Sequence, residues 1–166
     1  MEDLFRDRRL IELHDYWLSK KGNRVATRRS DIDLTVIPSL LPVLQVIEVS
    51  RDPLRFRHRM VGTEVVEAMG RDVTGEAIDR ELYGEATNEI AASLEAVVRE
   101  VRPYRRVAHL SWHDRDWLEI EAIELPLVDD EGQVVALLCG VDFRRREPGP
   151  GPRMVHEPLP AQDGAN

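Results

Sequence analysis

Two histidines, His109 and His113, stand four residues apart, the spacing of a metal-binding pair on a helix. The surrounding residues alternate as in a strand, where four residues span about 13 Å, so we expect the two rings to lie apart. Ser111, Asp114 and Asp116 add the residue types of a hydrolytic triad, but neighbours in sequence do not have triad geometry. We therefore expect no metal site and no catalytic centre in this segment, and we interpret the protein as non-enzymatic.

Three carboxylates, Glu119, Glu121 and Glu124, could perform general acid–base chemistry. Carboxylates on a strand usually form a solvated face, and we expect one here. The single cysteine, Cys139, excludes an internal disulfide. It lies in an apolar run, which favours inert burial over redox sensing, because a reactive thiol needs exposure and a lowered pKa.

A basic connector contains Arg24, Arg28 and Arg29, a possible anion site. The segment from Arg28 to Asp31 has the Arg-x-x-Asp form found at some cyclic-dinucleotide sites, and guanidinium groups suit phosphates. Motifs this short also arise by chance. The alternative is that these arginines hold the connector to acidic strands.

The composition bounds the class of protein. The chain has 166 residues, of which 42% are hydrophobic and 33% charged, so one domain can bury a core. The net charge of −8 argues against broad nucleic-acid binding, which needs a basic face. No apolar run approaches the ~20 residues of a membrane span, and the first residues do not resemble a signal peptide. We expect a cytoplasmic protein.

The N-terminal residues 3–20 have the periodicity of an amphipathic helix. Leu10, Leu13 and Trp17 lie on its apolar stripe. Left uncovered, this stripe would be an exposed hydrophobic patch. We therefore expect residues 1–22 to be a dimerisation helix, with these three side chains in the interface of a homodimer.

The central residues 23–145 indicate an α+β domain. Residues 42–62 read as a hairpin, and helices are expected at 63–69 and 84–101. Further strands are expected at 104–112, 117–126 and 132–143, which gives a five-stranded antiparallel sheet with helices on one face. The last strand is apolar on both faces, so the N-terminal helix, from its own or a partner chain, is the candidate cover for the second face. Residues 146–166 contain five of the ten prolines and are expected to be a disordered tail.

The order of these elements resembles a PAS domain over roughly residues 10–145. The segment FRHRMVGTEVVEAMGRDVTG resembles the second strand and first helix of that family, and GEATNEIAASLEAVV resembles its long helix. EGQVVALLCGVDFRRRE resembles its final strand. The opening DYW…RRSDIDL…IPSLLPVLQVIEV is similar to short bacterial proteins that consist of a single PAS domain.

The resemblance implies a sensory or regulatory module with a small cavity between sheet and helices, often paired through an N-terminal helix. Because no effector domain follows, we expect output through dimerisation or an unidentified signalling protein. The photoreceptor subset of the family carries Gly-Arg-Asn-Cys, whereas this chain reads Gly70-Arg71-Asp72-Val73, which argues against covalent flavin. Haem-binding members place a histidine on the long helix, and residues 84–101 contain none, which argues against haem. The identity of any other cofactor stays open.

The alternation of residues 55–60 places Phe56, His58 and Met60 on the face opposite three arginines. For His58, a core histidine bonded to backbone and a polar contact to a ligand are both compatible with this position. Strand parity and helix spacing together give the candidate pocket residues Phe56, His58, Met60, Met69, Leu94 and Val98. The alternative function is a protein-interaction scaffold whose PAS-like core is filled by its own side chains and binds no ligand.

Overall fold

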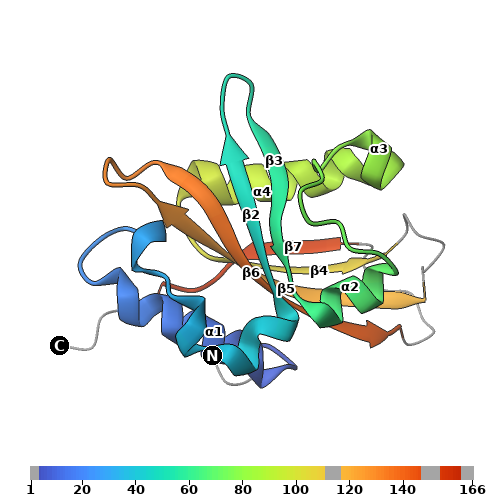
Figure 1. Ribbon diagram of the computed structural model, residues 1–166, viewed down its shortest axis with the longest axis horizontal. Helices are drawn as coiled ribbons and strands as arrows, with labels where there is room; N and C mark the ends of the chain where they lie inside the picture. Colours follow the sequence, from blue (N-terminus) through green and yellow to red (C-terminus); the bar gives the residue numbers. More distant parts are fainter. Residues whose placement is uncertain (1–3, 111–116, 147–153, 162–166) are drawn as a thin grey trace.

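A twisted sheet with helices on both faces forms the body of the protein (Figure 1). The computed structural model describes residues 4–110, 117–146 and 154–161. Its sheet order is β3-β2-β6-β5-β4-β7, and neighbouring strands in this order are antiparallel. A short strand, β1, pairs in parallel with β5. The strands are β1 Thr27–Arg28, β2 Leu44–Ser50, β3 Arg55–Val61, β4 Tyr104–His109, β5 Leu118–Val128, β6 Val134–Arg145 and β7 Met154–Pro158.

The helices begin and end at recognisable caps. Helix α1 follows Asp7, whose carboxylate accepts a hydrogen bond from the Arg9 amide at 2.8 Å. Helix α2 ends at Gly70, which adopts the left-handed conformation that glycine tolerates best. The α-helices are α1 Arg8–Lys21, α2 Thr63–Met69, α3 Arg80–Tyr83 and α4 Thr87–Glu100, and the short 3-10 helices are η1 Arg29–Asp31, η2 Leu34–Val36, η3 Pro38–Val43 and η4 Gly84–Ala86.

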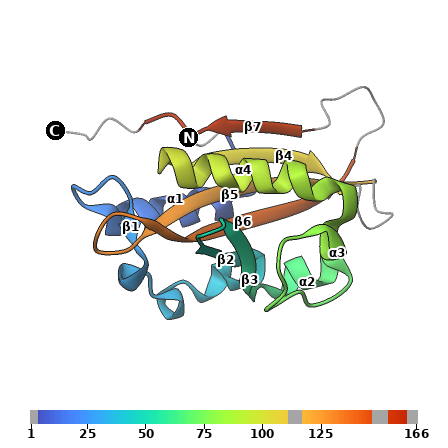
Figure 2. The same cartoon turned by 90° about the horizontal axis from the view of Figure 1, so that it is seen from above.

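Helices α1 and α4 cover opposite faces of the sheet. A side chain at Gly140 of β6 would meet Leu10 and Leu13 of α1. The preceding residue, Cys139, lies with Leu94 of α4 in one pocket on the other face. Figure 2 shows α4 lying along β4 and β5. The apolar character of both faces of β6 follows from this double cover, as the sequence predicted.

The α+β prediction and all five expected strands are confirmed, but the described residues contain seven strands, two more than expected. Strand β1 is too short for a periodic signal. Strand β7 lies in the segment that we expected to be disordered, so that prediction is wrong for residues 154–158. Leu159, the next residue, is 3% exposed, and its amide donates to the carbonyl of Pro103 at 2.9 Å. The other tail residues, 147–153 and 162–166, lie outside the described residues.

The prediction of disorder failed because it took no account of where the prolines lie relative to the strand. Pro158 terminates β7 instead of interrupting it, and β7 is an edge strand, where proline is tolerated. Counting prolines over the whole segment concealed a short run, Met154 to Glu157, that can pair along β4.

The predicted dimer interface at Leu10, Leu13 and Trp17 is also wrong. These side chains are at most 1% exposed because α1 packs on the sheet of its own chain. The Trp17 indole donates to the carbonyl of Pro126 at 2.9 Å, which fixes the helix to β5. The apolar stripe was identified correctly, but its cover is intramolecular.

We predict that Leu13→Ala lowers the free energy of unfolding by about 2–5 kcal/mol, because the cavity left over Gly140 cannot collapse fully. Urea denaturation measures this loss, and light scattering should give the same oligomeric state as the unchanged protein. Leu18→Ala, at a half-buried position of the same helix, is the control and should cost less. A changed oligomeric state with unchanged stability would contradict the assignment of Leu13 to the core.

We predict that a chain ending at Arg153 melts at least about 3 °C lower than the full chain. Burial of Leu159 alone is worth about 1.5–3 kcal/mol, and each kcal/mol shifts the melting temperature by about 2–4 °C at this size. A chain ending at Ala161 retains β7 and serves as the control in the same calorimetric scan. Equal melting of the two truncated chains would show that β7 adds nothing to stability.

Candidate ligand pocket

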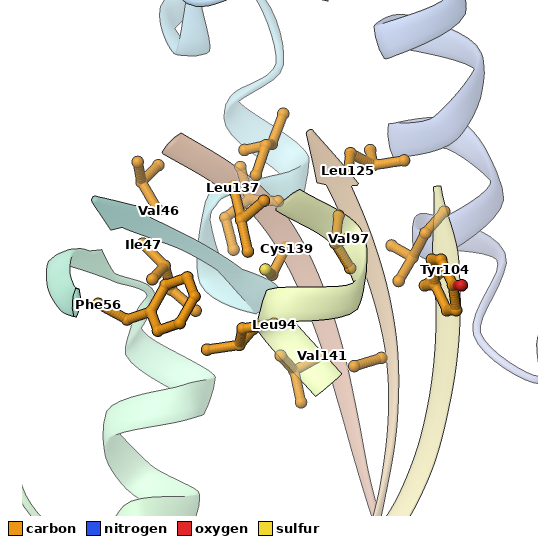
Figure 3. Packing of buried hydrophobic residues seen from close by; sticks show 14 of the residues in the cluster. Val46, Ile47, Phe56, Leu94, Val97, Tyr104, Leu125, Leu137, Cys139 and Val141 are labelled. Atoms are coloured by element: carbon orange, nitrogen blue, oxygen red, sulfur yellow. The ribbon is translucent and has the colours of Figure 1, made fainter. Parts of the chain in front are cut away.

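An internal pocket lies between the sheet and helices α2 to α4. Its volume is about 40 Å³, which is room for only a few waters. In Figure 3, Leu94 and Val97 of α4 lie over Ile47, Cys139 and Val141 of the sheet. The lining is mainly apolar and includes Ile47, Met69, Ile78, Ile90, Leu94, Leu110, Ile120, Ala122, Val141 and Phe143, with Gln45, His58, Tyr83, Arg106 and Cys139 as its polar or polarisable members.

Strand pairing brings the sheet side of this lining together. Gln45 of β2 lies opposite Cys139 of β6, and Ala122 of β5 lies between Val141 of β6 and Arg106 of β4. Cross-strand partners point to the same face, so these residues form one surface under α4. The sheet therefore presents one cationic side chain to an otherwise largely apolar cavity.

Three of the six predicted pocket residues, His58, Met69 and Leu94, line this cavity. Phe56 is buried in the core and Val98 is half-buried beside it, and neither lines the cavity.

Met60 is displaced by a β-bulge. It lies opposite Val46, whereas His58 lies opposite Ile47, and the register shifts between these pairs. Because Val46 and Ile47 point to opposite faces, Met60 leaves the face of His58. The alternation from which Met60 was predicted is thus interrupted after His58.

His58 and Tyr83 form a buried polar pair at one side of the pocket. The distance from His58 Nε2 to the Tyr83 hydroxyl is 2.7 Å. Burial lowers the pKa of His58 to about 4 and raises the pKa of Tyr83, so both side chains are neutral at pH 7. His58 is 3% exposed, and its Nδ1 has no hydrogen-bond partner among the described residues. The ring of His58 therefore does not bond to backbone as expected. Its Nε2 contacts the Tyr83 hydroxyl, and its Nδ1 has no partner among the described residues.

Arg106 connects the opposite side of the pocket to a buried carboxylate. Its Nε donates to Glu124 Oε1 at 2.7 Å, and His156 Nε2 of β7 lies 2.9 Å from Glu124 Oε2. Burial opposes ionisation of Glu124, but the Arg106 guanidinium and the His156 contact hold its pKa below the usual value. The His156 ring also stacks on Tyr104, with centroids 4.3 Å apart.

Glu121 forms a matching cluster on the α1 face. Its carboxylate accepts hydrogen bonds from the Arg6 amide at 3.0 Å and from Arg105 Nη2 at 2.6 Å. Arg105 also pairs with Glu157 of β7 at 3.1 Å. Both Glu121 and Glu124 have no exposed surface, so the expected solvated face is wrong for them. Sequence analysis missed the signal available in Arg105 and Arg106, adjacent arginines on the strand that pairs with these carboxylates.

The predicted anion site is largely neutralised within the chain. Arg24 Nη2 lies 2.6 Å from Asp31 Oδ2, and Arg28 pairs with Asp31 at 3.2 Å and with Asp130 at 3.3 Å. Only Arg29 of the three has no ion pair within the described part of the chain. The alternative, that these arginines hold the connector to acidic strands, has support only from Arg28, which reaches Asp130 in the turn after β5, because the pairs with Asp31 lie within the connector itself.

The segment from Ser111 to Asp116, with its suspected triad residues and His113, lies outside the described residues. His109 Nε2 is 3.8 Å from Glu119 Oε2. Within residues 4–110, 117–146 and 154–161, no three His, Cys, Asp or Glu side chains are grouped so that they could hold a metal ion. Cys139 is buried as predicted, and burial raises the pKa of its thiol.

We predict that His58 makes stability depend on pH between 6.5 and about 4. Its pKa is lower in the folded state, so the unfolded chain binds the extra proton, and stability falls as pH drops through this window, by about 3 kcal/mol in total. Other groups titrate nearby, so the measurement is the difference between the unchanged protein and His58→Gln in urea denaturation at each pH. Parallel stability curves for the two proteins would refute a buried neutral His58.

The solved structures similar in fold to this chain include two of low sequence identity from Vibrio cholerae. The first is the VqmA dimer in the absence of target DNA, with a TM-score of 0.50 and 12% identity over 68% of this chain and 52% of that chain. The second is a sensory box sensor histidine kinase, with a TM-score of 0.45 and 11% identity over 86% and 98% of the two chains. This chain thus spans about half the length of VqmA. No curated protein matches.

None of the helices in the described part of the chain is long and apolar enough to cross a membrane. A family model for the PAS domain matches residues 5–141, which include α1, the helices over the pocket and most of the sheet. PAS domains are generally sensory modules, so this match supports a sensory or regulatory role. The match confirms the resemblance seen in the sequence, and the chain belongs to the PAS domain family.

Proposed function

We propose that this protein is a non-enzymatic sensor that binds a small molecule in the pocket between the sheet and α2 to α4. The observation that carries the proposal is the convergence of His58, Tyr83 and Arg106 on one apolar cavity. Ligand pockets commonly combine apolar walls with a few placed polar groups that fix orientation. The orphan Nδ1 of His58 is a polar atom that a bound molecule or a water could satisfy.

The chemistry of the lining suggests the class of ligand. His58 and Tyr83 are neutral, so they favour an uncharged polar group. Arg106 uses Nε for Glu124, and a guanidinium carries further N–H donors that suit a carbonyl or carboxylate. The walls between them are mainly aliphatic or aromatic, with Gln45 and Cys139 as further polar or polarisable members. The proposed ligand is a small molecule with an apolar body and a hydrogen-bond acceptor at the end near Arg106.

The second candidate function is a scaffold with a filled core. The observation that favours it is the pocket volume of about 40 Å³, which holds waters but not a larger metabolite unless the side chains around it move. The two candidates differ in one measurable property, the presence of a bound molecule.

We also propose a cytoplasmic homodimer that signals to a protein partner. VqmA, which is similar in fold over part of its length, is described as a dimer. The buried stripe of α1 cannot supply the contact, so a dimer would use another surface. The net charge of −8 disfavours nucleic acid as a sequence-independent partner.

We predict that native mass spectrometry of the full chain, with an absorbance spectrum beside it, detects excess mass from a co-purified molecule. Ala122→Leu, which fills the pocket floor, should abolish the excess mass, because a larger side chain takes the ligand's space. Ala92→Leu makes the same change on the exposed side of α4 and should retain it. Excess mass that survives Ala122→Leu would place the molecule elsewhere and refute the pocket.

A defined probe series covers the case in which purification removes the ligand. Octanoate, octanamide and octylamine share one apolar body and differ only in the head group. Titration followed by methyl NMR should rank the carboxylate or the amide above the amine, since Arg106 repels a cation. Absence of shifts at pocket methyls for all three, combined with no excess mass, would support the scaffold.

A further inference from the structure

Strand β7 is fastened to the sheet through two buried carboxylates of β5, one on each face. On the pocket face, His156 lies 2.9 Å from Glu124. On the α1 face, Glu157 pairs with Arg105, which in turn binds Glu121. We call residues 154–159 the C-terminal strap. Its side chains are half-buried or exposed except Leu159, and in the described sheet β7 pairs only with β4.

The strap and the pocket share Glu124. One carboxylate oxygen accepts from Arg106, which lines the pocket, and the other contacts His156 of the strap. The route from the cavity to the edge strand therefore passes through Arg106, Glu124 and His156, with hydrogen-bond distances of 2.7 and 2.9 Å.

The buried carboxylate of Glu124 is stabilised by two neighbours, Arg106 and His156. Its carboxylate has no exposed surface, and a buried charge that loses its partner is costly. If Arg106 turned toward an acceptor in the pocket, Glu124 would retain only the His156 contact. Departure of the strap would uncover the edge of the sheet and let water reach the carboxylate, which removes that cost.

We propose that the C-terminal strap is displaceable and that a ligand which draws Arg106 away from Glu124 releases it from β4. The ligand step rests on the proposed function, whereas the coupling concerns only Arg106, Glu124 and His156. Release would leave the N–H and C=O groups of β4 unpaired along a free edge, which is a template for a strand of a partner protein. Occupancy of an internal cavity would thereby be converted into an external binding surface.

Hydrogen–deuterium exchange of the full chain tests the coupling without any ligand. Arg106→Gln removes the charge that pairs with Glu124, and we expect at least tenfold faster exchange in the strap and β4 with unchanged exchange in β2 and β3. Adding Glu124→Gln to this variant removes the unpaired carboxylate and should restore the protection of the strap and β4 against exchange. Arg59→Gln, the same substitution at an exposed position of β3 outside this network and the pocket, is the control and should leave the strap protected.

Unchanged strap exchange in Arg106→Gln, or faster exchange that Glu124→Gln does not reverse, would overturn the proposal. If Arg106→Gln does not fold, Arg106→Lys, which keeps the charge but loses the planar fork, takes its place with the same rescue. If the protein binds none of the octyl probes, but Glu124→Gln restores the strap protection lost in Arg106→Gln, the proposed ligand is contradicted. The coupling between Arg106, Glu124 and the strap is then still supported. A chain that binds octanoate at pocket methyls while the variants leave the strap protected contradicts the coupling alone.

Discussion

Glu121 and Glu124 point to opposite faces of β5, and neither has any exposed surface. A carboxylate in the interior must be neutralised or paired, and these two are paired by arginines of the neighbouring strand β4. Arg105 and Arg106 of β4 supply one cation to each face, and β7 adds Glu157 to one cluster and His156 to the other. The strands β5, β4 and β7 are therefore held in this order by ion pairs between their side chains as well as by backbone hydrogen bonds. Without β7, both clusters would lie one strand closer to water.

The same constraint gives the pocket its polarity. Because Arg106 is needed at Glu124, a cationic side chain is held at the margin of a cavity whose other walls are mostly apolar. An arginine fixed on a strand by a buried carboxylate is better positioned than one on a loop, since its partner limits its rotamers. A second polar group of the lining, His58, comes from β3 at the far side of the sheet and faces Tyr83 of α3.

Periodicity predicted the elements well and their partners poorly. The five strands, the helices and the cover over both faces of β6 follow from apolar spacing, which is a local property. The covering of α1 by its own sheet depends on Gly140, far along the chain, and could not be read from the stripe of Leu10, Leu13 and Trp17 alone. The bulge that turns Met60 away likewise arises from pairing with β2. The burial of Glu121 and Glu124 depends on a strap that proline content concealed, although the adjacent arginines were a usable signal.

The Nδ1 atom of His58, which has no partner among the described residues, has a different physical meaning in each of the two functional candidates. A buried polar group without a partner costs about 1–3 kcal/mol, and a core that serves only as filling avoids that cost with an aliphatic residue. His14 Nδ1 also has no hydrogen-bond partner among the described residues, but His14 lies on α1 and does not line the pocket of His58, so the feature alone is not a sign of ligand binding. His58 differs from His14 in its location, because His58 lines the same cavity as Arg106. A ligand that contacts both would satisfy the nitrogen at one end and compete with Glu124 at the other, so recognition and release of the strap would come from one binding event.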